Sequence, residues 1–497
     1  MADGELASLD EIVTRLERAL ATSPADSTEL VWIEARRSQV TAGRGRREAP
    51  RPPGPGARGG VAEADAPAGA PARERSLLIR VRQSGRTGLH RTAGAELSDL
   101  ENAVRYALAQ ARLAPATAAE PLASGVERRG HTTDAGGAGG ARSAADPAGG
   151  PVGTAVQSQG DAFHDPEIAG LEPGRVRALL DGVAERGETL QLAWLEGVVA
   201  IINSAGLRRS ARVTAASFET RCGRGPGCGT AAGAARRFDG LYLQDTLDRA
   251  RARHAGDGAA GNAAPALPAD LMLVFSEQSV AALLDLLNRH GLTAAAQRDA
   301  GSWLRSRLGE TLLASCLSLR DDGTDPRALP FPFDLAGWPK RRVDLVVDGV
   351  FATPAVDVSL AQEIGRSPTP HAMAPDESIA ANLILLAGDR APLPESELLR
   401  QAEGGIWVGA LSGLECYDPG RLRFRAVARG VRSIAGGALG PPLPDLVWED
   451  DLAAALSRSQ ALGDQPLAIV TGDMLFGATV APLLALQGAP SLIPKTT

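Results

Sequence analysis

A chain of 497 residues is long enough for about three domains, each with a buried core of its own. Its formal net charge of −7 excludes the basic surface by which nucleic-acid-binding proteins hold phosphates. No stretch reaches the roughly 18 consecutive apolar residues of a membrane span, and the acidic, amphipathic N-terminus is unlike a signal peptide. We therefore expect a cytoplasmic protein that binds neither nucleic acid nor membrane.

The first 121 residues predict an N-terminal α+β region. Apolar residues at helical or alternating spacing, with Ser8 as a cap before the first helix, indicate its elements. In chain order these are a helix at 9–20, a strand at 29–40, a hairpin at 76–92 and a helix at 95–111. Residues 41–73 are mainly Pro, Gly, Ala and Arg without apolar periodicity, so we expect a disordered insert there.

Residues 122–160 are low in complexity and predict a linker, after which 161–255 continue the N-terminal α+β domain. A tight turn at 203–206 joins two long predicted strands, because Asn and Gly tolerate the positive φ that such a reversal needs. The expected elements are a helix at 174–186, strands at 189–203 and 208–221, and a helix at 241–254. A second linker rich in Ala, Gly and Pro spans 256–269.

The C-terminal part, 270–497, predicts one strand, LMLVFS, then a helix at 279–290 and then mostly strands. These short apolar runs are separated by Gly and Pro, which favours an antiparallel sheet or a barrel-like β domain. The expected fold class is therefore α+β. An N-terminal mixed α/β domain with antiparallel strands and helices precedes a mostly antiparallel, barrel-like C-terminal domain.

The stretch from Ser318 to Gly365 is the most distinctive in the chain. It begins with an Asp-Asp-Gly turn, continues through a Pro-Phe-rich run ending at Asp334, and then steps through Lys340-Arg341-Arg342 into the strand VDLVVDGV. Lys340 and Lys495 are the only lysines, and arginine-for-lysine usage with abundant Ala and Gly indicates a GC-rich genome rather than a function.

That stretch resembles the TldD/PmbA family, also known as the "modulator of DNA gyrase" type. Further pieces occur in the order that the family shows: DPEIAGLEPG, NSAGL, NLILLAGD, GIWVGALSG and GAPSLIP. The resemblance implies a relation to cytosolic zinc-dependent proteases that act on unfolded peptides. Because the family has metal-bearing and metal-free members, it leaves open whether this chain has chemistry of its own.

The resemblance implies that a catalytic member carries HExxxH on the helix after the LMLV-like strand, with a cysteine near the C-terminus completing the zinc site. Zinc needs converging imidazoles or a thiolate, an open position for water, and a nearby carboxylate. Here the motif positions fall on Leu283, Leu284 and Asn288, and leucine has no lone pair to give. The segment IVTGDMLFGATVAP, which aligns with the cysteine-bearing stretch, contains no Cys.

Shifting the alignment by two residues places Asp285, Leu286 and His290 in those positions, which recovers one histidine but no glutamate beside a first ligand. We therefore interpret the leucines as the core face of the helix and His290 as a polar residue near its C-terminus. Neither alignment provides a catalytic, cofactor-binding or metal-binding residue. Zinc is expected only in a catalytic partner.

Other candidate groups have simpler interpretations. Cys222 and Cys228 form a C-x5-C pair, half of a zinc site without a second pair, and we interpret them as ordinary thiols. Four carboxylates could cluster in space, although solvated turn residues are the simpler interpretation: Asp321, Asp322, Asp334 and Asp348. His371 lies in a Pro-rich loop and shows no partner in the sequence. No GxSxG elbow or GxxxxGK[ST] phosphate loop occurs.

The leading hypothesis is a metal-free, PmbA/TldE-like subunit that forms a heterodimer with a TldD-like zinc protease. Its strand-rich walls would help to hold an extended peptide substrate by edge pairing. A diverged homodimeric binding or scaffold protein is the alternative, and an independent hydrolase with another site is a third.

Overall fold

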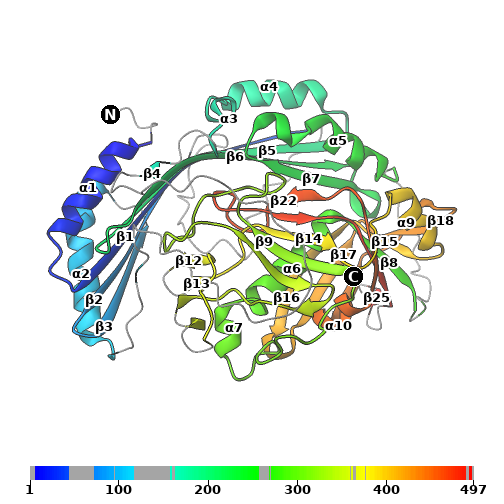
Figure 1. Cartoon of the computed structure of the whole chain (residues 1–497). Helices are drawn as coiled ribbons and strands as arrows, with labels where there is room; N and C mark the ends of the chain where they lie inside the picture. The colour runs from blue at the N-terminus through cyan, green and yellow to red at the C-terminus, as the bar shows by residue number, and fades with distance from the viewer. Residues whose placement is uncertain are drawn as a thin grey trace, which may run out of the picture.

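The computed structural model describes residues 6–43, 72–93, 96–116, 122, 157–158, 163–256, 268, 270–358, 360–361, 365–374, 377–488 and 492–494. The insert expected at 41–73 and the two expected linkers lie almost entirely outside these residues. The predicted α+β class is confirmed. Figure 1 shows a long, curved N-terminal sheet that arches over a C-terminal part built from several smaller sheets.

The N-terminal part is built on one large sheet, with strand order β3-β2-β1-β5-β6-β4 and β7 paired to β6. All pairs are antiparallel except β4 with β6. Its strands are β1 (Ser27–Gly43), β2 (Ala72–Gln83), β3 (Arg86–Ala93), β4 (Gln157–Ser158), β5 (Glu188–Asn203), β6 (Arg208–Cys222) and β7 (Gly229–Ala235). Its helices are α1 (Leu9–Ala21), α2 (Leu100–Leu113), α3 (Pro166–Ala169), α4 (Pro173–Val183) and α5 (Leu243–Ala252).

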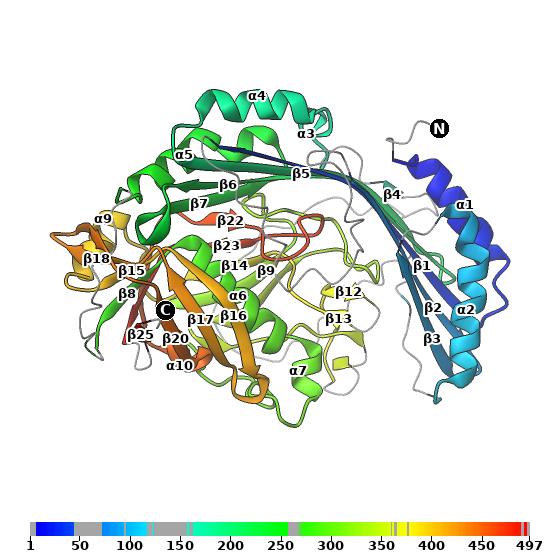
Figure 2. The same cartoon turned by 180° about the vertical axis from the view of Figure 1, so that it is seen from behind.

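The two faces of this sheet are covered differently, because side chains alternate along each strand. Leu30 and Trp32 of β1 point to the outer face, where α1 and α2 pack against them, while α3, α4 and α5 cover the outer face at the other end (Figures 1 and 2). Val31 points to the concave face and packs with residues of the C-terminal part, including Phe331 and Phe476. The concave face is therefore where the two parts of the chain meet.

The C-terminal part consists of open sheets rather than a barrel. Its strand orders, within the described residues, are β11-β10-β9-β14-β23-β22, β19-β18-β15-β8-β24-β21, β16-β17-β20-β25 and β12-β13. Two pairs are parallel, β8 with β15 and β14 with β23, so the sheets are mixed and not purely antiparallel. No helix in the described part of the chain is long and apolar enough to cross a bilayer.

The strands of this part are β8 (Met272–Phe275), β9 (Leu317–Asp322), β10 (Arg342–Val347), β11 (Val350–Phe351), β12 (Ala372–Ala374), β13 (Glu377–Ser378), β14 (Leu383–Ala387), β15 (Ile406–Val408), β16 (Ala410–Asp418), β17 (Arg423–Arg429), β18 (Arg432–Ala435), β19 (Ala438–Pro442), β20 (Leu446–Asp451), β21 (Ser459–Leu462), β22 (Leu467–Ile469), β23 (Thr479–Ala481), β24 (Leu484–Gln487) and β25 (Leu492–Pro494). Its helices are α6 (Glu277–His290), α7 (Ala294–Arg298), α9 (Glu395–Gln401) and α10 (Leu452–Ser457).

A buried arginine joins the two parts. Arg236, directly after β7, is 7% exposed and donates hydrogen bonds to backbone carbonyls on both sides. Its acceptors are the carbonyl oxygens of Thr214, Leu329, Pro330, Met474 and Leu475. Burial lowers the pKa of Arg236 to about 9. Because buried donors are costly when unpaired, this set of bonds fixes the segments around 330 and 475 against the sheet.

Candidate functional site: the cleft under the curved sheet

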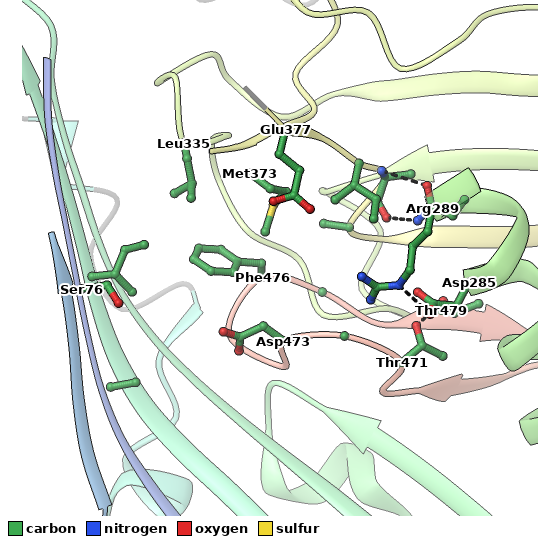
Figure 3. Close-up of a pocket in the computed structure, with 18 of the residues that line it drawn as sticks. Ser76, Asp285, Arg289, Leu335, Met373, Glu377, Thr471, Asp473, Phe476 and Thr479 are labelled. Atoms are coloured by element: carbon green, nitrogen blue, oxygen red, sulfur yellow. Dashed lines mark hydrogen bonds and ion pairs between the residues drawn. The ribbon is translucent and has the colours of Figure 1, made fainter. Parts of the chain in front are cut away.

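A cleft of about 180 Å³ lies between the concave face of the N-terminal sheet and the C-terminal part. One wall comes from alternate residues of β1 and β2: Ile33, Ala35, Arg37, Glu74, Ser76 and Leu78. The other wall comes from α6, the β12–β13 hairpin and the loop from Thr471 to Thr479 (Figure 3). The cleft is therefore assembled from segments that are far apart in the sequence.

Helix α6 forms because Ser276 caps its first turn, accepting a hydrogen bond from the backbone nitrogen of Ser279, and leucines recur along its inner face. Leu283 and Leu284 are 0% and 1% exposed and belong to the largest apolar core of the described residues. The expected first two motif positions therefore point into the core. The interpretation of these leucines as core residues is confirmed.

Asn288, at the third motif position, does line the cleft, but both its Nδ2 and its Oδ1 are hydrogen-bonded to one backbone residue. Its Nδ2 donates to the carbonyl oxygen of Ala380 at 2.7 Å, and its Oδ1 accepts from the backbone nitrogen of Ala380 at 3.2 Å. Asn288 thus ties α6 to the segment before β14 as a backbone group would. Residues five apart also point about 140° away from each other on an ideal helix.

The shifted alignment gives no better site. Asp285 lines the cleft, where its carboxylate accepts a 2.8 Å hydrogen bond from Nε of Arg289. Burial raises the pKa of Asp285, although the bond from Arg289 opposes this. Leu286 is buried, and burial lowers the pKa of the half-buried His290. Across the described ranges, no group of three or more His, Cys, Asp or Glu side chains is placed to hold a metal ion.

The segment that aligns with the family's cysteine-bearing stretch forms the cleft wall from Thr471 to Thr479. Of the cysteines named above, Cys222 is buried and lies 3.5 Å from Glu188 Oε1, and burial together with that carboxylate raises its pKa to about 12. The four thiols are all free. A protonated thiol is neither a nucleophile nor a metal ligand.

An ion-pair cluster connects the two walls. Arg37 of β1 donates to Glu74 at 2.9 Å and to Asp473 at 2.7 Å, and Asp473 lies 436 residues away in the sequence. The same Asp473 accepts a hydrogen bond from the backbone of Leu475. The curved sheet and the Thr471–Thr479 loop are thereby held together on one side of the cleft.

The interpretation of the acidic residues as solvated turn residues is wrong for three of them. Asp321, Asp334 and Asp322 are 0%, 2% and 9% exposed, while Asp348 lies in an exposed turn. Asp321 follows Leu317 and Leu319 at a spacing of two on β9, so the strand period itself directs it to the buried face. That alternation was the signal in the sequence that could have located it.

His371 does have partners. Its Nδ1 lies 2.6 Å from Thr369 Oγ1, and its Nε2 lies 3.3 Å from Asp321 Oδ2. The ammonium of Lys340 lies 3.6 Å from the same oxygen, and all three side chains are at most 2% exposed. Burial alone would raise the pKa of Asp321. Lys340, His371 and the backbone nitrogen of Asn382 together outweigh burial, so the pKa of Asp321 lies well below its usual range. Burial lowers the pKa of His371, which keeps the imidazole neutral at pH 7.

Residues 268–489 match the family model described as the PmbA/TldA metallopeptidase C-terminal domain. This C-terminal part of the chain therefore belongs to the TldD/PmbA family. The match covers β8, α6 and the strands that follow as far as β24, and these include α6, the β12–β13 hairpin and the Thr471–Thr479 loop of the cleft. No curated protein matches the chain significantly.

Solved structures share the fold of this chain over nearly its full length. TldE from Thermococcus kodakarensis has a TM-score of 0.70 at 14% identity, covering 98% of this chain and 100% of that one. Candidate modulators of DNA gyrase from Thermotoga maritima and Bacteroides thetaiotaomicron both have a TM-score of 0.69, at 15% and 16% identity, covering 98% of this chain and 99% of theirs.

The zinc chemistry of a metallopeptidase domain does not fit α6 of this chain. A catalytic zinc requires imidazole, thiolate or carboxylate ligands with an open fourth position. The cleft-facing side of α6 carries Asp285, Asn288 and Arg289, and the two potential oxygen ligands are already bound by Arg289 and Ala380. A guanidinium beside the carboxylate would also repel a metal cation.

Proposed function

We propose that this chain is the metal-free, non-catalytic subunit of a TldD/TldE-type metalloprotease complex that acts on unfolded peptides or peptide precursors. One observation carries the proposal: the helix expected to hold zinc places Leu283 and Leu284 in the core. Its cleft-facing side presents the Asp285–Arg289 ion pair instead. A zinc-bearing, TldD-like partner supplies the peptidase chemistry, and both work in the cytoplasm.

The cleft suits a role in holding peptide. It combines apolar side chains, among them Leu335, Met373 and Phe476, with hydroxyls and charged groups. Short strands border it at the β12–β13 hairpin, whose edges can pair with an extended backbone. Recognition through backbone hydrogen bonds tolerates many sequences, as unfolded substrates require.

Co-expression with an HExxxH-bearing family member from the native host tests this proposal. We expect the two chains to elute together in size-exclusion chromatography, and the pair to cleave an unfolded peptide that the pure chain leaves intact. Cleavage by the pure chain would refute the non-catalytic role. A homodimer that does not bind the HExxxH-bearing chain would support the alternative, a diverged homodimeric binding or scaffold protein.

A further inference from the structure

The cleft contains an arginine whose binding capacity is only partly used. Nε of Arg289 donates to Asp285 Oδ2 at 2.8 Å, one helical turn away, which fixes the plane of the guanidinium. The side chains of this pair are 29% and 23% exposed, so neither moves freely in solvent. The two terminal nitrogens of Arg289 have no hydrogen-bond partner among the described residues, and Figure 3 shows them on the cavity side of the helix.

The backbone of the Thr471–Thr479 loop passes close to this guanidinium. A Cβ at Gly472 would lie 3.5 Å from Nη2 of Arg289, so the absence of a side chain there keeps the cleft beside Nη2 from being narrowed further. Arg37, on the opposite wall, already pairs with two carboxylates, with Glu74 through Nε and with Asp473 through Nη2. Arg289 therefore offers two parallel N–H donors to a ligand, and this planar fork matches a carboxylate better than any other common peptide group.

Apolar side chains on the same wall as Arg289 define the rest of the ligand. Met373, Leu335 and Phe476 provide an apolar surface on the C-terminal wall, and Phe476 packs edge-on against Phe331 at 5.3 Å between centroids, which holds its ring in place. A carboxylate next to an apolar side chain fits both features at once. The carboxy-terminal residue of an extended peptide has this combination, and so does an acidic side chain that precedes an apolar residue.

We propose that Arg289 is a carboxylate-recognition residue. Its guanidinium binds a peptide carboxylate while the neighbouring apolar side chain of the peptide packs against Met373 and Phe476. This inference rests on the proposed function in one respect, because it assumes that the cleft holds peptide. It goes further than that function because it names the peptide group, a carboxylate, that the cleft recognises. Asp285 acts as a positioning residue that orients the guanidinium without touching the ligand.

Fluorescence anisotropy with the full-length chain tests the inference with three N-terminally labelled peptides. The first is Gly-Ser-Gly-Ala-Leu with a free α-carboxylate, the second is its C-terminal amide, and the third is the amide of Gly-Ser-Glu-Ala-Leu. Because a charge-assisted pair contributes about tenfold or more in affinity, the free acid should bind at least about tenfold more tightly than its amide. Tight binding of the third peptide would add side-chain carboxylates to the recognised groups.

Variants separate recognition from structure. Arg289→Gln should reduce the affinity for the free acid to that for the amide and leave the amide unchanged. Asp285→Asn keeps an oxygen for Nε and removes a competing charge, so the free acid should bind as tightly as before or more tightly. Arg400→Gln, which removes an ion-paired helix arginine outside the cleft, is the matched control and should change neither affinity. The double variant Asp285→Asn/Arg289→Gln removes both charges of this half-buried pair. If it binds the free acid as weakly as Arg289→Gln does, the lost affinity of Arg289→Gln does not come from an unpaired Asp285 that disturbs α6.

Equal affinity of the wild-type chain for acid and amide would overturn the inference, and so would a preference for the acid that survives in Arg289→Gln. In both cases the proposed function stands if the chain still joins an HExxxH-bearing partner. Absence of binding by all three peptides, together with failure to join that partner, would overturn both.

Discussion

The buried cluster of Asp321, Lys340 and His371 gives the sharpest stability prediction. Lys340 is one of two lysines among 52 basic residues, and its side chain is 2% exposed with Nζ 3.6 Å from Asp321 Oδ2. Lys340→Met keeps most of the volume but leaves the Asp321 carboxylate buried beside a neutral imidazole. Removing one partner of a buried ion pair costs about 3–5 kcal/mol. At roughly 2–4 °C per kcal/mol for a domain of this size, Tm should fall by about 6–20 °C.

Differential scanning calorimetry of three variants checks this reasoning. Asp321→Asn/Lys340→Met removes both charges, and Asn can still accept the hydrogen bond from the backbone nitrogen of Asn382, so Tm should recover most of the loss. Lys340→Arg should also be destabilised, because the Lys340 side chain is only 2% exposed and the planar guanidinium is larger than the ammonium that it would replace. The reasoning is refuted if Lys340→Met unfolds within about 1 °C of wild type, well below that range, or if the double variant is no more stable than the single one.

Three further predictions concern α6, pH and thiol reactivity. Leu283→His/Leu284→Glu restores two motif positions, yet both side chains would be buried in a leucine core, so Tm should fall and added zinc should not restore it; calorimetry with and without zinc measures this. Burial lowers the pKa of His371 in the folded chain, so the unfolded chain takes up a proton on this imidazole at a higher pH than the folded chain does. The free energy of unfolding should therefore decrease as the pH falls from 6.5 through the folded pKa of His371. In thermal unfolding between pH 5 and 7.5, His371→Gln should lose less stability than the wild type as the pH falls. Burial raises the pKa of Asp334 to about 6, so Asp334 makes stability increase as the pH falls, and it does so equally in the wild type and in His371→Gln. Cys222, with a pKa of about 12, should resist iodoacetamide at pH 8 in the native chain and react after denaturation, as mass spectrometry would show.

Local patterns in the sequence were sufficient for most of the N-terminal elements. The helix predicted at 9–20 is α1 at Leu9–Ala21, and the predicted hairpin is β2 with β3. Short elements of the C-terminal part, such as α9 and α10, were not predicted, since helices of 7 and 6 residues carry too few turns for a periodic signal. Their stability comes from tertiary packing instead.

The cleft could be predicted only in part. The leucines of α6 revealed their core role through helical spacing, and the position of the helix followed from the strand before it. The Arg37–Asp473 pair, the opposing sheet wall and the exposed face of Arg289 depend on contacts between distant segments, which periodicity does not encode. His371 and Lys340 were missed for the same reason, because their shared partner Asp321 lies on another strand.

The zinc content of the pure full-length chain tests the central claim most directly. The chain is equilibrated with excess zinc, dialysed, and measured by inductively coupled plasma mass spectrometry beside its co-purified complex with an HExxxH-bearing partner. We predict far less than one zinc per chain alone and one zinc per complex. One tightly held zinc in the chain alone, lost on Asp285→Asn or Asn288→Ala, would contradict the account.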